Sequence, residues 1–390
     1  MIPYGRHYID EDDIQEVVNV LRGGSLTQGP TVEAFETAVA TYVSSKYAVA
    51  VSSATAGLHL AAIAAGVGPD RSLVTSPITF VASSNAALYA GGRAVFADID
   101  PQTVNLSPSS LAALLTKNQE VRAVVPVHFA GLPCDMPAIK AVADKAGVVI
   151  IEDAAHALGA VYSDGRRVGS CAYSLMTVFS FHPVKAIAAG EGGMITTNDE
   201  PTYRRLLQLR SHGINKPGDP LVFPELGSHG GIVNSWYYEM QQLGYHYRIT
   251  DIQCALGLSQ LRKLDKFIAR RRQLVDVYDH AFLGLKNASP AQTTGRNESG
   301  HHLYVLRIDF PGIGRTRGQL MKDFRDRDII TQVHYIPVPA QPFYRSQNFD
   351  LVDYPHAQCY YEQALSIPLF YNLTEDEQAR VIHAIKELVG

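Results

Sequence analysis

Short apolar runs alternate with amphipathic segments over the first half of the chain. Runs of four to six residues rich in Val, Ile and Ala are typical of strands buried on both faces of a sheet. Strands separated in this way by helical segments predict a mainly parallel sheet with helices on both faces, which is an α/β fold. We expect strands near 48–51, 72–76, 94–98, 123–127, 148–152, 175–180 and 194–197.

The second half of the chain breaks this alternation. A long segment rich in Gly, Pro, Ser and Asn runs over 213–247 and holds the only tryptophan, Trp236. Loops of this length are usually functional or bury against a partner. Further on, the apolar spacing from Leu261 to Phe282 predicts one long helix that leads into a second domain.

We expect this second domain to be a smaller α+β unit. Its pattern predicts a strand at 303–308, a helix at 319–327, a short strand at 331–335 and two closing helices. The chain is thereby divided into a large domain over 1–245, with an N-terminal arm, and a small C-terminal domain over 246–390. The N-terminal arm contains the i, i+3, i+4, i+7 spacing of a helix, at Ile14, Val17, Val18 and Leu21.

Composition and charge narrow the classes of function. The 390 residues are 46% apolar and 18% charged, which is typical of a packed globular protein. A formal charge of −4 disfavours nucleic acid as a partner. No apolar stretch is long enough for a membrane span, and no secretory signal is visible. The four cysteines lack metal-ligand spacing, so we expect no metal and a cytoplasmic protein with reduced thiols.

Polar residues follow several predicted strands, at the sheet edge where α/β proteins bind ligands. The run 148–151 is followed by Glu152, Asp153 and, three residues later, His156. A carboxylate there can pair with a cationic ring nitrogen. It can equally be a helix-capping aspartate beside a core histidine, and both readings stay open on this segment alone. A magnesium site of a P-loop enzyme is not supported, because GxxxxGK[ST] does not occur.

Lys185 lies just beyond another predicted strand and is followed by the glycine-rich segment 190–193. Burial can lower the pKa of a lysine from about 10.4 toward about 7 to 8, which makes its amine nucleophilic toward an aldehyde. A single lysine is far more often a solvated surface charge. Lys185 therefore gains meaning only together with the neighbouring motifs.

The segment 53–58 stands between a strand and a helix, where free backbone amides and the Thr55 hydroxyl can bind an anion. An ordinary helix cap is the simpler interpretation of this segment alone. Ala54 and Thr55, with Ser180, can hold one phosphate from two sides, and Phe80 can stack on a flat ring. A phosphate cradle, an aromatic face, a carboxylate and an amine together describe pyridoxal 5'-phosphate and few other ligands.

The sequence resembles the DegT/StrS family of sugar-nucleotide aminotransferases, which have the fold-type I architecture of pyridoxal phosphate enzymes. The resemblance covers essentially the whole chain. It rests on LTQGP (26–30), SSATAGLHL (52–60), IEDAAHALGA (151–160), FSFHPVKAIAAGEGGM (179–194) and YRITDIQCALG (247–257).

The resemblance implies a role for each matching position. Lys185 corresponds to the lysine that holds the cofactor as a Schiff base, and Asp153 to the partner of the pyridine nitrogen. His156 would lie near the phenolic oxygen, Phe80 would stack on the ring, and Ala54, Thr55 and Ser180 would hold the phosphate. Where the family usually has an asparagine that reaches the neighbouring subunit's cofactor, this chain has His246.

Four further stretches, MIPYGR, NSWYYEMQQLGY, HLYVLRI and QVHYIPV, are most similar to the pseudaminic acid branch of the family. That branch forms UDP-4-amino-4,6-dideoxy-N-acetyl-β-L-altrosamine from a UDP-linked 4-keto sugar with L-glutamate as amino donor, and the resemblance implies a homodimer with shared active sites. Aminotransfer to another keto sugar such as UDP-4-keto-arabinose, and a non-catalytic sensor of cofactor or sugar nucleotide, are the alternatives. Candidate substrate-binding residues are Arg6, Thr27, Arg248, Tyr304 and His334.

Overall fold

The computed structural model describes residues 1–390 and is built around a seven-stranded sheet. The strand order is β1-β7-β6-β5-β4-β2-β3, and only β7 runs against its neighbours. The seven strands predicted for the first half of the chain are all present, and the mainly parallel α/β sheet is confirmed. Their bounds are β1 (Tyr47–Val51), β2 (Ser72–Thr75), β3 (Arg93–Phe96), β4 (Val121–Val125), β5 (Val149–Asp153), β6 (Met176–Ser180) and β7 (Gly193–Thr197).

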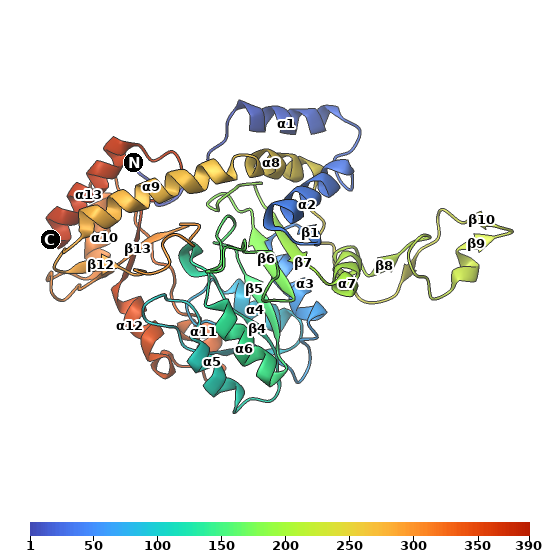
Figure 1. Ribbon diagram of the computed structural model, residues 1–390, viewed down its shortest axis with the longest axis horizontal. Coiled ribbons are helices and arrows are strands. Elements are labelled where there is room, and N and C mark those ends of the chain that lie inside the picture. The colour runs from blue at the N-terminus through green and yellow to red at the C-terminus, as the bar shows by residue number, and fades with distance from the viewer.

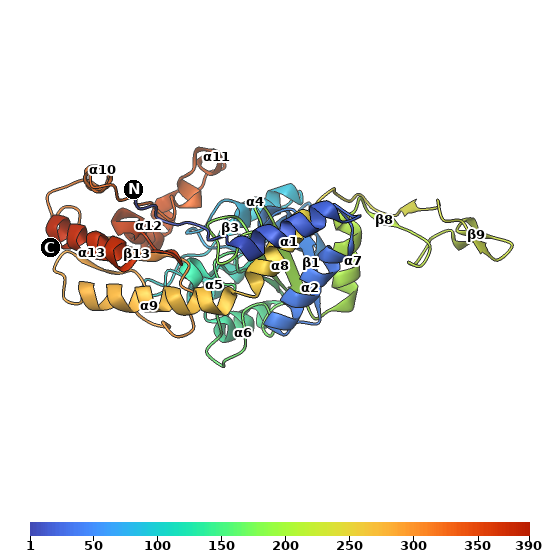
Figure 2. The same ribbon diagram turned by 90° about the horizontal axis from the view of Figure 1, so that it is seen from above.

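Helices cover both faces of this sheet, as Figure 1 and Figure 2 show from two directions. One face packs against α2, α5, α6 and α8, and the other against α3, α4 and α7. Each layer buries its own apolar core, so the sheet is shielded from water on both sides. The bounds are α1 (Glu11–Arg22), α2 (Pro30–Val43), α3 (Ala54–Ala64), α4 (Ala82–Tyr89), α5 (Pro108–Leu115), α6 (Met136–Ala146), α7 (Glu200–Arg210) and α8 (Asp251–Leu261).

The C-terminal part forms a second core around a three-stranded antiparallel sheet of order β12-β13-β14. The smaller α+β unit is thereby confirmed, with α10 close to its predicted range. Its elements are α9 (Leu264–Phe282), β12 (Ala288–Pro290), β13 (Tyr304–Ile308), α10 (Arg317–Arg325), α11 (Pro342–Arg345), α12 (Pro355–Gln363), β14 (Ala364–Ile367) and α13 (Glu375–Val389).

One detail of the prediction for this half is confirmed and one is wrong. The long helix expected from Leu261 to Phe282 is present as α9, which begins three residues later, at Leu264, because Leu261 ends α8. The strand expected at 331–335 is absent, because only Gln332 forms a bridge, to Ser366. Since α8 and the first turns of α9 pack on the core of the large sheet, we propose that the change from one core to the other occurs within α9.

The segment 213–245 projects away from the body of the molecule (Figure 1). From here on, "the arm" means this segment and not the N-terminal arm. It holds a short 3₁₀ turn and the two-residue strands β8 (Ile214–Asn215), β9 (Ser228–His229), β10 (Ile232–Val233) and β11 (Glu239–Met240). The buried Glu239 carboxylate ties the arm together by accepting the amides of Val222 and Phe223 at 2.6 and 2.8 Å. None of the helices combines the length and apolarity that crossing a membrane requires.

Candidate active site

The carboxyl end of β5 places Asp153 at the edge of the sheet. Its side chain is buried, and Oδ2 accepts the Ser83 hydroxyl at 2.6 Å while Oδ1 accepts the Ala155 amide at 3.1 Å. Ser83 belongs to α4, so the carboxylate is fixed from two elements. A carboxylate held in this way keeps one orientation, as a partner for a ring nitrogen must.

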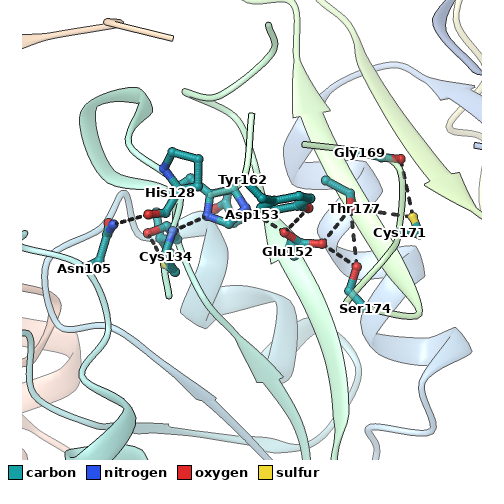
Figure 3. A network of polar contacts seen from close by, with 12 residues as sticks. Asn105, His128, Cys134, Glu152, Asp153, Tyr162, Gly169, Cys171, Ser174 and Thr177 are labelled. Atoms are coloured by element: carbon teal, nitrogen blue, oxygen red, sulfur yellow. Dashed lines mark hydrogen bonds and ion pairs between the residues drawn. The ribbon is translucent and has the colours of Figure 1, made fainter. Parts of the chain in front are cut away.

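Glu152, the residue before Asp153, points to the other side of β5 and anchors this strand end (Figure 3). It is fully buried and accepts hydrogen bonds from His128 Nε2 at 2.8 Å and Tyr162 at 2.6 Å, and from Ser174 and Thr177. Burial alone would raise the pKa of Glu152, but these donors, led by His128, hold it below its ordinary value. The strand end is therefore fixed on both faces.

Lys185 follows β6 in a turn closed by its own amide, which donates to His182 O at 2.8 Å. Desolvation lowers the pKa of Lys185 to about 8, and the attraction of Asp153 only partly opposes this shift. The recess next to it is lined by Arg6, Tyr8, Gln260 and Arg271, among others, and no acidic side chain lines it. A far larger fraction of this amine than of an ordinary lysine is thus unprotonated near neutral pH, the state in which it is a nucleophile.

The segment 53–58, for which we expect a phosphate cradle, forms the N-terminus of α3. The Ser53 side chain caps the helix by accepting the Ala56 amide at 3.1 Å, which leaves the amides of Ala54 and Thr55 without an intrahelical acceptor. Gly193 of the neighbouring strand lies so close that a Cβ there would stand 2.6 Å from the Ala54 nitrogen. Glycine is therefore required for this approach. Ser180 ends β6, and its hydroxyl accepts only a long 3.4 Å bond, from the His182 amide.

His156 lies in an aromatic row that the sequence analysis did not foresee. Its ring is 4.3 Å from that of His302 and 6.0 Å from that of Tyr335, whose hydroxyl lies 3.0 Å from His156 Nε2. Burial, with Lys185 and His334 nearby, lowers the pKa of His156 well below its ordinary value, so the ring is neutral. Phe80, with its side chain exposed, stands 6.3 Å from Tyr335 at the outer end of the row.

The structure brings Lys185, Asp153, His156 and His334 into one electrostatic neighbourhood. His334 is buried, and its Nδ1 lies 2.8 Å from the Ser366 hydroxyl. Arg6 is exposed at the recess beside Lys185. Three residues near the site, Ser83, His302 and Tyr335, were not among the predicted ones, although HLYVLRI contains His302 and QVHYIPV contains Tyr335.

The remaining predicted residues are Tyr304, Thr27, His246 and Arg248. Tyr304 is not brought to the site: it is buried in the core of the small domain and donates to Asp279 at 2.7 Å. Thr27 is exposed and bridges Thr250, while His246 is exposed at the base of the arm. Arg248 lies near that base with its Nε sealed from solvent and without a partner.

Comparisons with known proteins agree with this geometry. The model of the DegT/DnrJ/EryC1/StrS aminotransferase family matches residues 7–386. The chain is 40% identical over 390 residues to the spore coat polysaccharide biosynthesis protein SpsC of Bacillus subtilis, covering 100% of this chain and 97% of that protein. This chain belongs to the DegT/DnrJ/EryC1/StrS aminotransferase family.

Solved structures of sugar aminotransferases have the same fold. The putative sugar aminotransferase Spr1654 from Streptococcus pneumoniae, in its PMP-form, has a TM-score of 0.89 at 29% identity over 100% of this chain and 99% of that one. Helicobacter pylori PseC, an aminotransferase involved in the biosynthesis of pseudoaminic acid, has a TM-score of 0.89 at 28% identity with the same coverage. The fold-type I architecture is confirmed, and the chain is a pyridoxal 5'-phosphate-dependent sugar aminotransferase.

The residues present fit pyridoxal 5'-phosphate. The free amides at the start of α3 suit a phosphate, the buried Asp153 suits a protonated ring nitrogen, and the poorly solvated Lys185 amine suits an aldehyde carbon.

The lowered pKa of Lys185 predicts that this residue destabilises the apoprotein. Between about pH 8 and 10.5 the unfolded chain binds the proton that the folded chain has lost, so the stability of the folded state rises with pH over this range. Below about pH 8 the folded state carries the full free-energy cost of burying the charged Lys185 amine. The Lys185→Met apoprotein should therefore unfold at a higher temperature than the wild-type apoprotein at pH 7, and its advantage should shrink toward pH 10.

Thermal unfolding of both apoproteins across this pH range measures the effect. The exposed Lys145 provides a matched control, since Lys145→Met should leave the midpoint nearly unchanged. A Lys185→Met midpoint at or below that of the wild type at pH 7, or a pH-independent gain, would contradict the account.

Proposed function

We propose that this aminotransferase moves the amino group of L-glutamate to the 4-keto carbon of a UDP-linked deoxy sugar, giving UDP-4-amino-4,6-dideoxy-N-acetyl-β-L-altrosamine. The observation that carries the proposal is the Lys185 amine, its pKa lowered to about 8, in one site with Asp153 and His156. The likeness to PseC over the whole chain and the motifs MIPYGR and QVHYIPV favour this sugar.

In this proposal each residue of the site holds one part of the cofactor. Ala54, Thr55 and Ser180 bind the phosphate, Phe80 covers the ring and His156 faces the phenolic oxygen. Asp153 keeps the ring nitrogen protonated. When bound, pyridoxal 5'-phosphate supplies an electron sink for the carbanion formed on the substrate.

Lys185 has two tasks. As a neutral amine it attacks the aldehyde carbon, and burial favours that neutral form. Once released by the incoming amino group, the same amine would take the proton from the substrate carbon and would deliver it to the former aldehyde carbon, on the other side of the nitrogen. The Asp153 charge favours the protonated amine and so stabilises it between the two transfers.

A panel of keto sugar nucleotides tests this function. The purified protein, supplied with pyridoxal 5'-phosphate and glutamate, should form 2-oxoglutarate and the 4-amino altrosamine product, with weaker turnover of UDP-4-keto-arabinose. Loss of a general acid or base typically costs about 10²- to 10⁴-fold, so Lys185→Ala should fall to the high end of this range or beyond.

The outcomes of this panel separate the alternatives. Preferred turnover of UDP-4-keto-arabinose would move the substrate assignment within the same family. Cofactor binding without turnover of any sugar in the panel would favour a sensor. More than a few per cent of wild-type turnover in Lys185→Ala would remove this lysine from its role.

We further propose a homodimer in which His246 and Arg248 of one subunit complete the site of the other. The arm and α1 leave many apolar side chains in water, which is typical of surfaces that bind a partner. These side chains include Ile14, Leu21, Val222, Phe223, Leu226, Ile232, Val233, Trp236, Tyr238, Met240 and Leu243. His246 and Arg248 lie at the base of the arm, where a second copy can be reached.

Subunit mixing tests the shared site. One parent carries Lys185→Ala and the other carries His246→Ala with Arg248→Ala, so each parent dimer lacks an essential group in both sites. A hybrid dimer has one site with all its groups intact and should regain up to about half of wild-type activity. Hybrids isolated by two affinity tags that stay as inactive as the parents would show that each subunit carries its own complete site.

A further inference from the structure

The recess beside Lys185 is lined by cationic side chains that no acidic side chain balances. Arg6 and Arg271 line it together with Lys185, and none of the three takes part in an ion pair of the structure. The recess holds about 10 Å³ of free space, which is about what one water-sized group needs. Its charge and its size therefore suit a single small group rather than a large ligand.

Arg271, on α9, is the buried part of this lining. Only 3% of the residue is exposed, and its Nη1 donates to the carbonyl oxygens of His301, His302 and Leu369 at 3.0 to 3.3 Å. Desolvation lowers the pKa of Arg271 to about 10, and no carboxylate opposes this shift. Buried arginines are normally paired with an acid. The three carbonyls orient the guanidinium, but they leave its positive charge without a counter-charge.

One nitrogen of this guanidinium is open to the recess. Nη2 of Arg271 makes no hydrogen bond within the protein, and it is not one of the atoms that are sealed from solvent. It differs in this respect from Nε, which is sealed and has no partner. Because Arg271 lines the recess, Nη2 is the atom through which the guanidinium reaches it. An acceptor in the recess can bind Nη2 without any rearrangement of the protein.

The wall that carries Arg6 is fixed in place. Gln260 Nε2, from α8, donates to Tyr8 O at 2.9 Å and to Asp13 Oδ2 at 2.7 Å, which ties the N-terminal segment to the body. The Asp13 carboxylate lies 3.0 Å from Lys263 Nζ, so its charge is already balanced. Arg6 is exposed on this segment, where its guanidinium is free to bind a ligand. Binding between fixed walls costs little ordering entropy.

We propose that this recess is a binding site for one small, singly charged anionic group, which accepts hydrogen bonds from Arg271 Nη2 inside the recess and from Arg6 at its mouth. Hydrogen bonds from a guanidinium to an anion are strong because both partners are charged. The free space suits a halide ion or the end of a carboxylate. Such a group can come from a free anion or from the carboxylate of the amino donor, and the second source rests on the proposed function.

Bromide is a probe of suitable size and charge, and anomalous diffraction locates it in crystals of the full-length protein. Loading the protein with pyridoxal 5'-phosphate first fills the expected phosphate cradle, so that bromide at the start of α3 cannot be mistaken for the recess site. We expect bromide within hydrogen-bond reach of Arg271 Nη2. Crystals that hold bromide elsewhere but none in the recess would overturn the proposal.

Thermal unfolding of the loaded protein tests the site in solution. Sodium bromide is compared with sodium gluconate, whose anion is too large for the recess, at equal ionic strength. At a bromide concentration about tenfold above half-saturation, the wild type should gain about 2 °C from the bound ion. Arg271→Gln should lose this gain. Arg272→Gln, which alters an exposed arginine of the same helix, should keep it. General salt effects are common to all variants, so the differences between them report the recess.

Two results would contradict the site in solution. An equal gain in Arg271→Gln and in the wild type, or no gain in the wild type, would overturn the proposal. If Arg271→Gln fails to fold, Arg6→Gln replaces it, because Arg6 is exposed and makes no contact that folding requires. Arg6→Gln should raise the half-saturating bromide concentration several-fold, and an unchanged value would overturn the proposal in that case.

Glutamate distinguishes the two sources of the anionic group. Expulsion of bromide from the recess by glutamate would identify the donor carboxylate as the occupant, whereas retention of bromide would identify a free anion. Both results support the site. Failure of the protein to transfer the amino group of glutamate to any keto sugar would reject the proposed function alone, since bromide in the recess does not depend on turnover.

Discussion

The site depends on the burial of two consecutive carboxylates at the carboxyl end of β5. Glu152 and Asp153 point to opposite sides of the strand, and each is held by hydroxyl, imidazole or amide donors rather than by a lysine or arginine. This arrangement leaves the charge of Asp153 free to act on a ligand. The amine of Lys185 meets only part of that charge, so desolvation dominates and its pKa falls. Without a fixed strand end, neither the charge nor the amine would be placed.

The sheet order brings the remaining groups to the same edge. β6 lies beside β5 and carries Ser180 and then Lys185, while β7 beside β6 brings Gly193 against the start of α3. The parallel strands β5 and β6 end on this side and the antiparallel β7 begins there, which is why residues far apart in sequence converge at this edge. The small domain adds His302, His334 and Tyr335 from the open side, so the site lies where the two cores meet.

The sequence predicts the large sheet well because each of its strands is a short, mostly apolar run, a pattern that depends on local burial alone. It also places Asp153 and Lys185 at strand ends. Tyr304 was proposed as a substrate contact, yet it packs inside the small domain, where its hydroxyl is satisfied by Asp279. The contact of Tyr335 with His156 spans 179 residues, and no local pattern encodes a contact of that range.

The central claim is that Lys185 is the residue that bonds to the cofactor. Borohydride reduction of the purified protein loaded with pyridoxal 5'-phosphate, followed by peptide mapping, measures this directly. The account predicts one pyridoxyl group per chain, on Lys185, and none on the exposed Lys145 or on Lys263, whose amine is engaged by Asp10 and Asp13. A label on another lysine, or no label while the protein binds the cofactor, would contradict it.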